Sequence, residues 1–209
     1  MLNAQTAQNQ SETTPSRALE LLKEGNQRFI ENKKVNRDLL RQVAQTKSGQ
    51  FPFATVLHCI DSRVSAELLF DQGIGDLFSI RIAGNFVNED ILGSMEFACK
   101  LAGTKVLLVL GHTHCGAVKG ACDRAELGNL TGMLSKITPA VDAVEVNHEQ
   151  KGSSNKQLVQ EVADLNVKRA IEQIRELSPV LAELEKNGDL LIHGGMYDIE
   201  TGKVTFEGY

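Results

Sequence analysis

Apolar and amphipathic stretches alternate along the chain from about residue 53 onward. Short apolar runs predict strands, and the longer stretches between them, with apolar residues at helical spacing, predict helices. The strands are expected at 54–60, 77–82, 105–110 and 190–193, and the helices at 65–71, 90–101, 116–125, 130–144 and 155–177. Strands that alternate with helices favour parallel pairing through right-handed crossovers.

The end of the chain carries a different signal. Thr201-Gly202 predicts a turn, and the following residues, 203–206, predict an antiparallel strand at the sheet edge. The expected fold class is therefore α/β. It has a mainly parallel central sheet of about four parallel strands plus an antiparallel edge strand, flanked by helices.

The amino-terminal part is polar at first and then helical. Residues 1–14 hold little apolar surface to offset the entropy of ordering, so this segment is expected to be disordered, and 15–209 is expected to form a single domain. Thr14-Pro15 predicts a helix start, and a second helix is expected over 37–47. Both precede the first strand and cannot be crossovers, so they are predicted to lie on a neighbouring subunit or along the flank of the domain.

Charge and composition narrow the class of protein. The formal net charge is −5, with Lys and Arg scattered, which argues against nucleic acid or a membrane surface as a partner. The apolar runs are too short to span a bilayer, and the first residues do not resemble a signal peptide. The four cysteines are too few for a disulfide framework, which favours metal or buried thiol roles in a reducing compartment. The expected location is cytoplasmic.

Two predicted strands end in residues that bind metals. Cys59 follows the first strand, and His112 and Cys115 follow the third. The carboxyl ends of parallel strands form the edge where open α/β sheets collect ligands, and zinc prefers tetrahedral nitrogen and sulfur donors. The sequence therefore predicts a zinc ion held by these three residues. His112 is preferred to His114, because adjacent residues such as His114 and Cys115 diverge in an extended chain.

Asp61 lies two residues after Cys59, so its carboxylate can face the same side as the thiolate. It can orient water beside the metal or bind the metal as a fourth ligand, and Arg63 can hold it away through paired hydrogen bonds. Two alternatives to a catalytic zinc stay open. One is a structural zinc with Asp61 as a permanent ligand, and the other is a pair of unrelated buried cysteines. Cys99 and Cys122 are expected to be core thiols.

The motifs Cys59-x-Asp61-Ser62-Arg63 and His112-x-x-Cys115-Gly116 together resemble the signature of the β-class carbonic anhydrases, and the similarity extends from about Ser16 to the end. Two further segments support it, Arg81-x-Ala83-Gly84-Asn85 and Gly195-Met196-Tyr197-Asp198. The resemblance implies one Zn²⁺ per subunit and a homodimer or homotetramer, in which the amino-terminal helices pack on the neighbouring subunit.

The resemblance also implies a reaction, the reversible hydration of carbon dioxide to bicarbonate and a proton by attack of zinc-bound hydroxide. The Asp61–Arg63 dyad would keep the fourth zinc position open. The substrate pocket implied by the resemblance contains Gln50, which would reach across a dimer interface, together with Phe78, Ala83, Phe97 and Gly116. Ordinary core packing is the alternative for the two phenylalanines.

Three further consequences follow from the resemblance. Val56 stands where some members carry a tryptophan of a second, inhibitory bicarbonate site, so that site is expected to be absent. A hydrolase of carbon disulfide or carbonyl sulfide would need the same zinc site and a similar apolar tunnel. A non-catalytic zinc protein would keep the same ligands. Both remain alternatives to the hydration of carbon dioxide.

Overall fold

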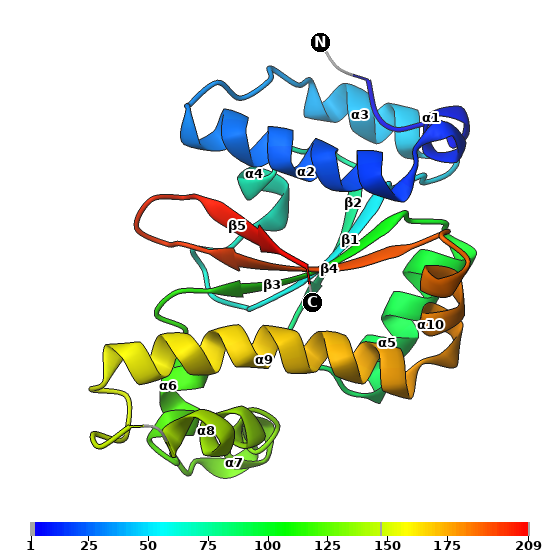
Figure 1. Ribbon diagram of the computed structural model, residues 1–209. Helices are drawn as coiled ribbons and strands as arrows, with labels where there is room; N and C mark the ends of the chain where they lie inside the picture. The colour runs from blue at the N-terminus through cyan, green and yellow to red at the C-terminus, as the bar shows by residue number, and fades with distance from the viewer. Residues whose placement is uncertain (1–2, 147, 209) are drawn as a thin grey trace.

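A five-stranded sheet forms the centre of the computed structural model, which describes residues 3–146 and 148–208 (Figure 1). The strand order is β2-β1-β3-β4-β5, and the first four strands are parallel, whereas β5 runs antiparallel to β4. The α/β class and the antiparallel edge strand are thus confirmed. The strands are β1 (Ala54–His58), β2 (Leu77–Arg81), β3 (Val106–His112), β4 (Leu191–Tyr197) and β5 (Val204–Glu207).

Helices cover both faces of the sheet (Figure 1). Alternate residues of a strand point to opposite faces, so β3 contributes side chains to the apolar layers on both sides of the sheet. Leu108 packs with residues of α2 (Pro15–Ile30) and α4 (Ala66–Leu69), whereas Leu107 and Val109 pack with those of α9 (Lys156–Leu177) and α10 (Pro179–Lys186). Strands buried on both faces explain the continuous apolar runs of the sequence.

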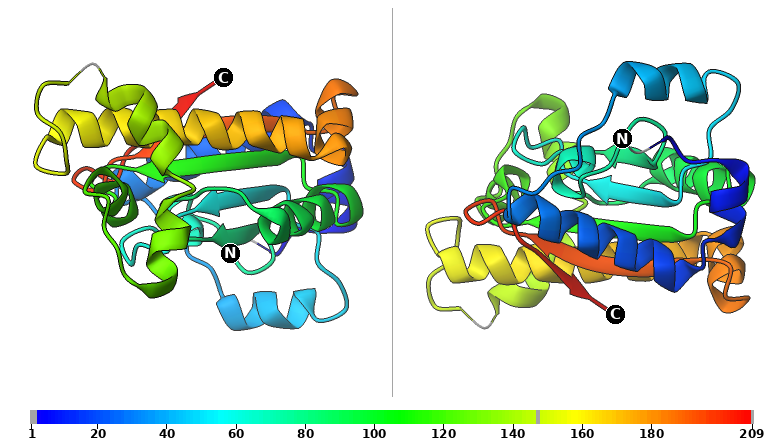
Figure 2. Two further views of the ribbon diagram at one scale, coloured as in Figure 1. Left: turned by 90° about the horizontal axis from the view of Figure 1, so that it is seen from below. Right: turned by 90° about the horizontal axis from the view of Figure 1, so that it is seen from above.

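The amino-terminal helices are predicted to lie on a neighbouring subunit or along the flank of the domain, and within the single chain α2 takes the second position. Thr14 caps α2 by accepting a hydrogen bond from the N–H of Arg17 at 3.2 Å, as the Thr14-Pro15 pattern predicts. The apolar face of α2 covers its own sheet, and Leu22 is fully buried there. By contrast, α3 (Leu39–Thr46) stands away from the body of the chain, and its Leu40 is 82% exposed (Figure 2).

The first residues are ordered by polar contacts. Helix α1 (Ala7–Glu12) lies within the segment expected to be disordered. The Gln10 side-chain amide donates to the carbonyls of Pro52 at 2.6 Å and Ala102 at 2.8 Å. The expectation of disorder therefore does not hold for 3–14, because hydrogen bonds that composition does not reveal replace hydrophobic burial. Residues 1 and 2 lie outside the described residues.

The remaining helices follow the predicted order with two changes. The helix predicted over 130–144 is two helices, because Pro139 sits in the first turn of the second. The helix predicted over 90–101 ends in a π-helical turn, η1 (Phe97–Leu101). No helix in the described part of the chain is long and apolar enough to cross a membrane. The helices are α5 (Glu89–Glu96), α6 (Gly116–Cys122), α7 (Gly128–Leu134) and α8 (Thr138–Glu145).

Candidate metal centre

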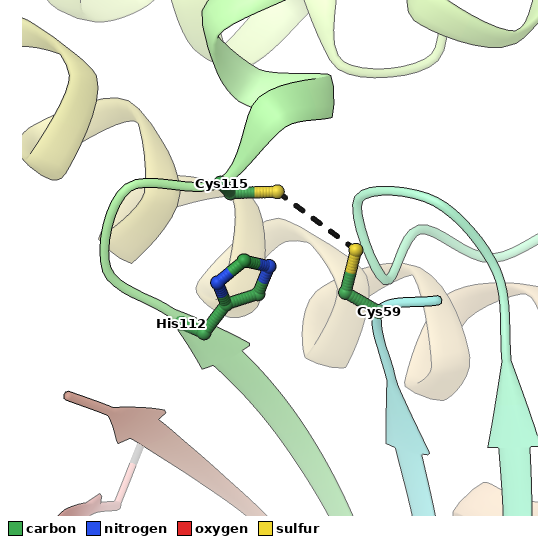
Figure 3. Close-up of side chains that lie close together, drawn as sticks. All are labelled: Cys59, His112 and Cys115. Carbon is green, nitrogen blue, oxygen red and sulfur yellow. Dashed lines mark hydrogen bonds between the residues drawn. The ribbon is translucent and has the colours of Figure 1, made fainter. Parts of the chain in front are cut away.

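Three metal-binding side chains meet at the carboxyl ends of β1 and β3 (Figure 3). These strands are parallel neighbours, and His58 is in register with Leu110, so Cys59 and His112 emerge at the same edge of the sheet. The donor atoms of Cys59, His112 and Cys115 all lie within 4.8 Å of one another, and all three residues are buried. The structure therefore brings together the three residues that the sequence predicts as zinc ligands.

The loop after β3 returns Cys115 to the cluster. His114 has a φ of 57°, in the left-handed region, which turns the chain sharply between the two ligands. The N–H of Thr113 donates to the carbonyl of Tyr197 at 2.9 Å and anchors the loop to the end of β4. The imidazole of His114 is outside the donor cluster and pairs with Glu200 at 3.2 Å.

His112 presents an unpaired nitrogen to the other two side chains. Its Nδ1 lies 2.9 Å from the carbonyl oxygen of Thr113, which places the proton on Nδ1 and the lone pair on Nε2. Nε2 is buried and has no hydrogen-bond partner among the described residues. Buried polar atoms are almost always satisfied, and a metal ligand commonly donates its other ring N–H to a carbonyl. A bound cation would satisfy Nε2.

The two thiols strengthen the case for a cation. Their sulfur atoms lie 4.0 Å apart, close to the separation of about 3.8 Å given by two Zn–S bonds of about 2.3 Å in a tetrahedron. The hydrogen bond from Cys115 lowers the pKa of Cys59, helped by the N–H of Gly84 at 3.3 Å. The same contact, together with burial, raises the pKa of Cys115. A divalent cation would displace the proton that the two sulfurs share, so the residues fit zinc.

The Asp61 carboxylate lies beside the donor cluster and is held by Arg63. The guanidinium donates to both carboxylate oxygens, at 2.9 Å from Nε and 2.7 Å from Nη2, and the N–H of Arg63 donates at 3.0 Å. These bonds keep the pKa of Asp61 well below its usual value, although burial acts in the opposite direction. Oδ2 lies 3.9 Å from Nε2 of His112, so the carboxylate adjoins the donor set without belonging to it.

Two further residues support this arrangement, and sequence reasoning gave them no role. Arg81 donates to the carbonyl of Asp61 at 2.9 Å and to that of Cys59 at 3.3 Å, which ties the end of β2 to the ligand loop. Gly84, with a φ of 83°, directs its N–H at the Cys59 sulfur. Both residues belong to the motif Arg81-x-Ala83-Gly84-Asn85. The position of this motif at the end of a predicted strand is the only sequence signal of their roles.

An apolar pocket of about 240 Å³ adjoins the donor cluster. Ala83 and Gly116, which the resemblance suggested, line it together with Cys59 and Asp61. Side chains of α7 complete the wall, and sequence reasoning missed them because helical periodicity identifies an apolar face and not what that face encloses. The additional lining residues are Ile60, Ala117, Gly120, Leu130, Met133 and Leu134.

The other suggested pocket residues lie elsewhere in this chain. Phe78 and Phe97 form an edge-to-face pair with ring centroids 6.2 Å apart, and they line a separate hollow of about 720 Å³ along the edge strand β2. Gln50 is exposed in the segment between α3 and β1. Within a single chain, the structure does not bring these three residues to the pocket beside Cys59.

Comparisons with known proteins agree with this geometry. The family model described as "Carbonic anhydrase" matches residues 54–204. Carbonic anhydrase 2 of Mycobacterium tuberculosis is 32% identical over 197 residues, which cover 91% of this chain and 92% of that protein. The carbonic anhydrase of Mycolicibacterium smegmatis is 33% identical over 198 residues, which cover 92% and 93%. Among solved structures, the β-carbonic anhydrase CcaA superposes with a TM-score of 0.71 at 28% identity, covering 91% of this chain and 95% of that one.

Proposed function

The chain belongs to the β-carbonic anhydrase family, and on that premise we propose that it catalyses the family's general reaction, the reversible hydration of carbon dioxide to bicarbonate and a proton. The observation that carries this proposal is the junction of two features. A buried donor cluster with an unpaired His112 Nε2 adjoins an apolar pocket of about 240 Å³, and that pocket also contains Asp61. A purely structural zinc site needs no such pocket.

We assign one zinc ion per subunit to Cys59, His112 and Cys115. When bound, zinc supplies the Lewis acidity that makes water nucleophilic at neutral pH. Two thiolates neutralise much of the charge of the ion, so protein groups must assist. Asp61 is suited to this role because its carboxylate, ionised and fixed by Arg63, can accept a hydrogen bond from the attacking water and orient it.

The pocket lining suits a small neutral substrate. Carbon dioxide has no charge and no hydrogen-bond donor, and apolar side chains such as Ala83, Leu130 and Met133 exclude competing water. Attack on its carbon places negative charge on oxygen. The N–H of Gly116, at the edge of the pocket, can stabilise that charge.

We further propose that the working unit is a homodimer, alone or paired into a tetramer. The outer edge of β2 has no strand partner among the described residues. Phe97 packs against Phe78 of β2, and Leu101, in the same π-helical turn as Phe97, is 76% exposed. An open sheet edge and large exposed apolar side chains mark an interface. Phe78 and Phe97 lie on this side and, together with the exposed Gln50, would complete the partner's pocket. The reduced thiols of the site favour the cytoplasm.

Stopped-flow measurement of carbon dioxide hydration, with zinc content determined on the same samples, tests the proposal. We expect rapid turnover with one zinc per chain, loss of both in Cys59→Ser, and retained zinc with strongly reduced turnover in Asp61→Ala. Cys122→Ser is the matched control, because Cys122 lies outside the donor cluster. A zinc-loaded wild type no faster than buffer would refute the proposal. Turnover of carbon disulfide alone would identify the alternative hydrolase.

A further inference from the structure

Helix α6 lies beside the start of α9 (Figure 1). A separate, partly open cavity lies there and shares no lining residue with the pocket beside the donor cluster. Its volume is about 180 Å³, roughly six times the share of one water molecule in the liquid. That is below the size of pockets for drug-sized ligands, so the cavity suits a small ion. The polar lining residues are His114, Lys119, Ser153, Ser154, Lys156 and Gln160.

The cavity has unpaired positive charge. Among the described residues, neither Lys119 nor Lys156 has a carboxylate oxygen within 4.0 Å, although both line the same hollow. Two acidic groups contact other residues that line the cavity. Asp123 accepts hydrogen bonds from the N–H of Ser153 at 2.7 Å and from its hydroxyl at 2.6 Å, and Glu200 pairs with His114 at 3.2 Å. Within the described part of the chain, neither ammonium group therefore forms an ion pair, and the charge of Asp123 is directed at Ser153.

The neighbouring polar groups add donors. The Ser154 oxygen accepts a hydrogen bond from the side chain of Gln150 at 3.2 Å, so its hydroxyl proton is free to be donated. Lys156 opens the 22-residue helix α9, which brings the positive end of a helix dipole to the cavity. All these features favour an anion.

We propose that this cavity is a binding site for a phosphate group. Ammonium groups are compact point charges that suit a tetrahedral oxyanion, whereas a planar carboxylate is matched best by the fork of an arginine. The group can be free inorganic phosphate or the phosphate of a monoester whose ester substituent projects out of the cavity. This inference concerns a site separate from the metal centre and does not depend on the hydration reaction.

Isothermal titration calorimetry with inorganic phosphate, on the zinc-loaded protein at fixed ionic strength, tests the proposal. We expect saturable binding of one phosphate per chain. Each of Lys119→Gln and Lys156→Gln should weaken binding about tenfold, because each removes one charge-assisted contact. Lys168→Gln, an exposed lysine on the same helix, is the matched control and should leave the affinity unchanged. Zinc content and circular dichroism establish that each variant is folded.

The outcomes are distinct. Absence of saturable binding to the wild type overturns the proposal. So does an undiminished affinity in the variant that combines Lys119→Gln with Lys156→Gln, since phosphate would then be bound elsewhere, for example at the metal. An equal loss in Lys168→Gln also overturns it, because the effect would be one of net charge. A parallel titration with phenyl phosphate identifies the source. Binding as tight as that of phosphate indicates a monoester, and binding of inorganic phosphate alone indicates the free ion.

Discussion

Arg63 donates hydrogen bonds to both carboxylate oxygens of Asp61, at 2.9 Å from Nε and 2.7 Å from Nη2. The same carboxylate lies only 3.9 Å from Nε2 of His112, a buried nitrogen without a hydrogen-bond partner among the described residues. A carboxylate is itself a good zinc ligand. Arg63 holds Asp61 beside the donor cluster in this structure, and we propose that loss of this contact would let the carboxylate enter it.

Arg63→Gln should lower turnover about 10²- to 10³-fold while zinc content stays near one per chain, since the freed carboxylate would occupy the position that water needs. The pKa of Asp61 would rise towards its ordinary value of about 3.9, so the group would stay ionised at neutral pH. Stopped-flow hydration and metal analysis measure both quantities. Arg17→Gln, which breaks the exposed pair with Glu24, should change neither. Full turnover in Arg63→Gln would contradict this assignment.

Thiol reactivity should separate the four cysteines into two classes. Burial raises the pKa of Cys99 and of Cys122 to about 11, so neither forms appreciable thiolate near neutral pH. In the folded protein, a disulfide reagent should modify Cys59, the thiol whose pKa is lowered, after zinc is removed by a chelator, and zinc should protect it. Absorbance of the released thiolate gives the count. Cys99→Ala should leave the count for the folded protein unchanged, and a decrease would show that Cys99 is reactive.

Asp71 should dominate the pH dependence of the amino-terminal half. Burial acts to raise its pKa, but hydrogen bonds from Arg28 at 2.6 Å and Arg37 at 2.5 Å outweigh burial and lower it. A lowered carboxyl pKa stabilises the fold above the unfolded value of about 3.9, and that stabilisation is lost as the pH falls. Asp71→Asn should cost about 3 kcal/mol in the free energy of unfolding at pH 7.

Urea unfolding at fixed protein concentration measures this cost, and the difference from the wild type should shrink as the pH falls below about 4. Asparagine is the suitable replacement because Asp71 has a φ of 46°, which asparagine tolerates. Asp142→Asn is the matched control. It breaks an exposed pair with Arg124 and should cost less than about 0.5 kcal/mol. Equal losses in the two variants would rule out a special role for Asp71.

Gly84→Ala should weaken zinc binding about tenfold, because it would displace the backbone N–H that residue 84 donates to the sulfur of Cys59. The φ of 83° at Gly84 strains any other residue, and an added Cβ would lie 2.4 Å from Cδ1 of Ile137, so the Ile137 side chain or the loop of Gly84 must shift. Competition with a chromogenic chelator measures the affinity. Gly132→Ala is the control, because nothing lies within 4 Å of the added carbon in α7. Equal affinities for wild type and Gly84→Ala would show that this hydrogen bond does not tune the site.

Charge introduced on the β2 side should dissociate the proposed dimer. Leu101→Glu and Leu40→Glu place a carboxylate on side chains that are 76% and 82% exposed in the single chain. Sedimentation velocity should show a smaller sedimentation coefficient for each variant than for the wild type. Turnover should also decrease if Gln50 contributes to the partner's pocket. Leu177→Glu, at a residue 56% exposed at the end of α9, should alter neither. A fully active monomer would separate Gln50 from catalysis.

The sequence sufficed for those parts of the fold that depend on local pattern. Runs such as 105–110 predicted buried parallel strands, and a ligand type at each strand end predicted the cluster of Cys59, His112 and Cys115. Features set by distant partners were not predictable. The hydrogen bonds of Gln10 order α1, and Met133 reaches the pocket only because α7 folds back over Gly116 and Gly120. The proposed role of Gln50, Phe78 and Phe97 in the substrate pocket stays a prediction, because that role requires a second subunit.

The ligands come from strands that are neighbours in space but not in sequence. Cys59 follows β1 and His112 ends β3, while β2 and α5 lie between them along the chain. A nascent polypeptide leaving the ribosome therefore carries only one of the three proposed ligands for the time needed to synthesise the whole intervening unit. It gains a chelating triad only after β3 has inserted beside β1. On the proposed assignment, an ion held by all three residues would therefore indicate that β1 and β3 have paired correctly.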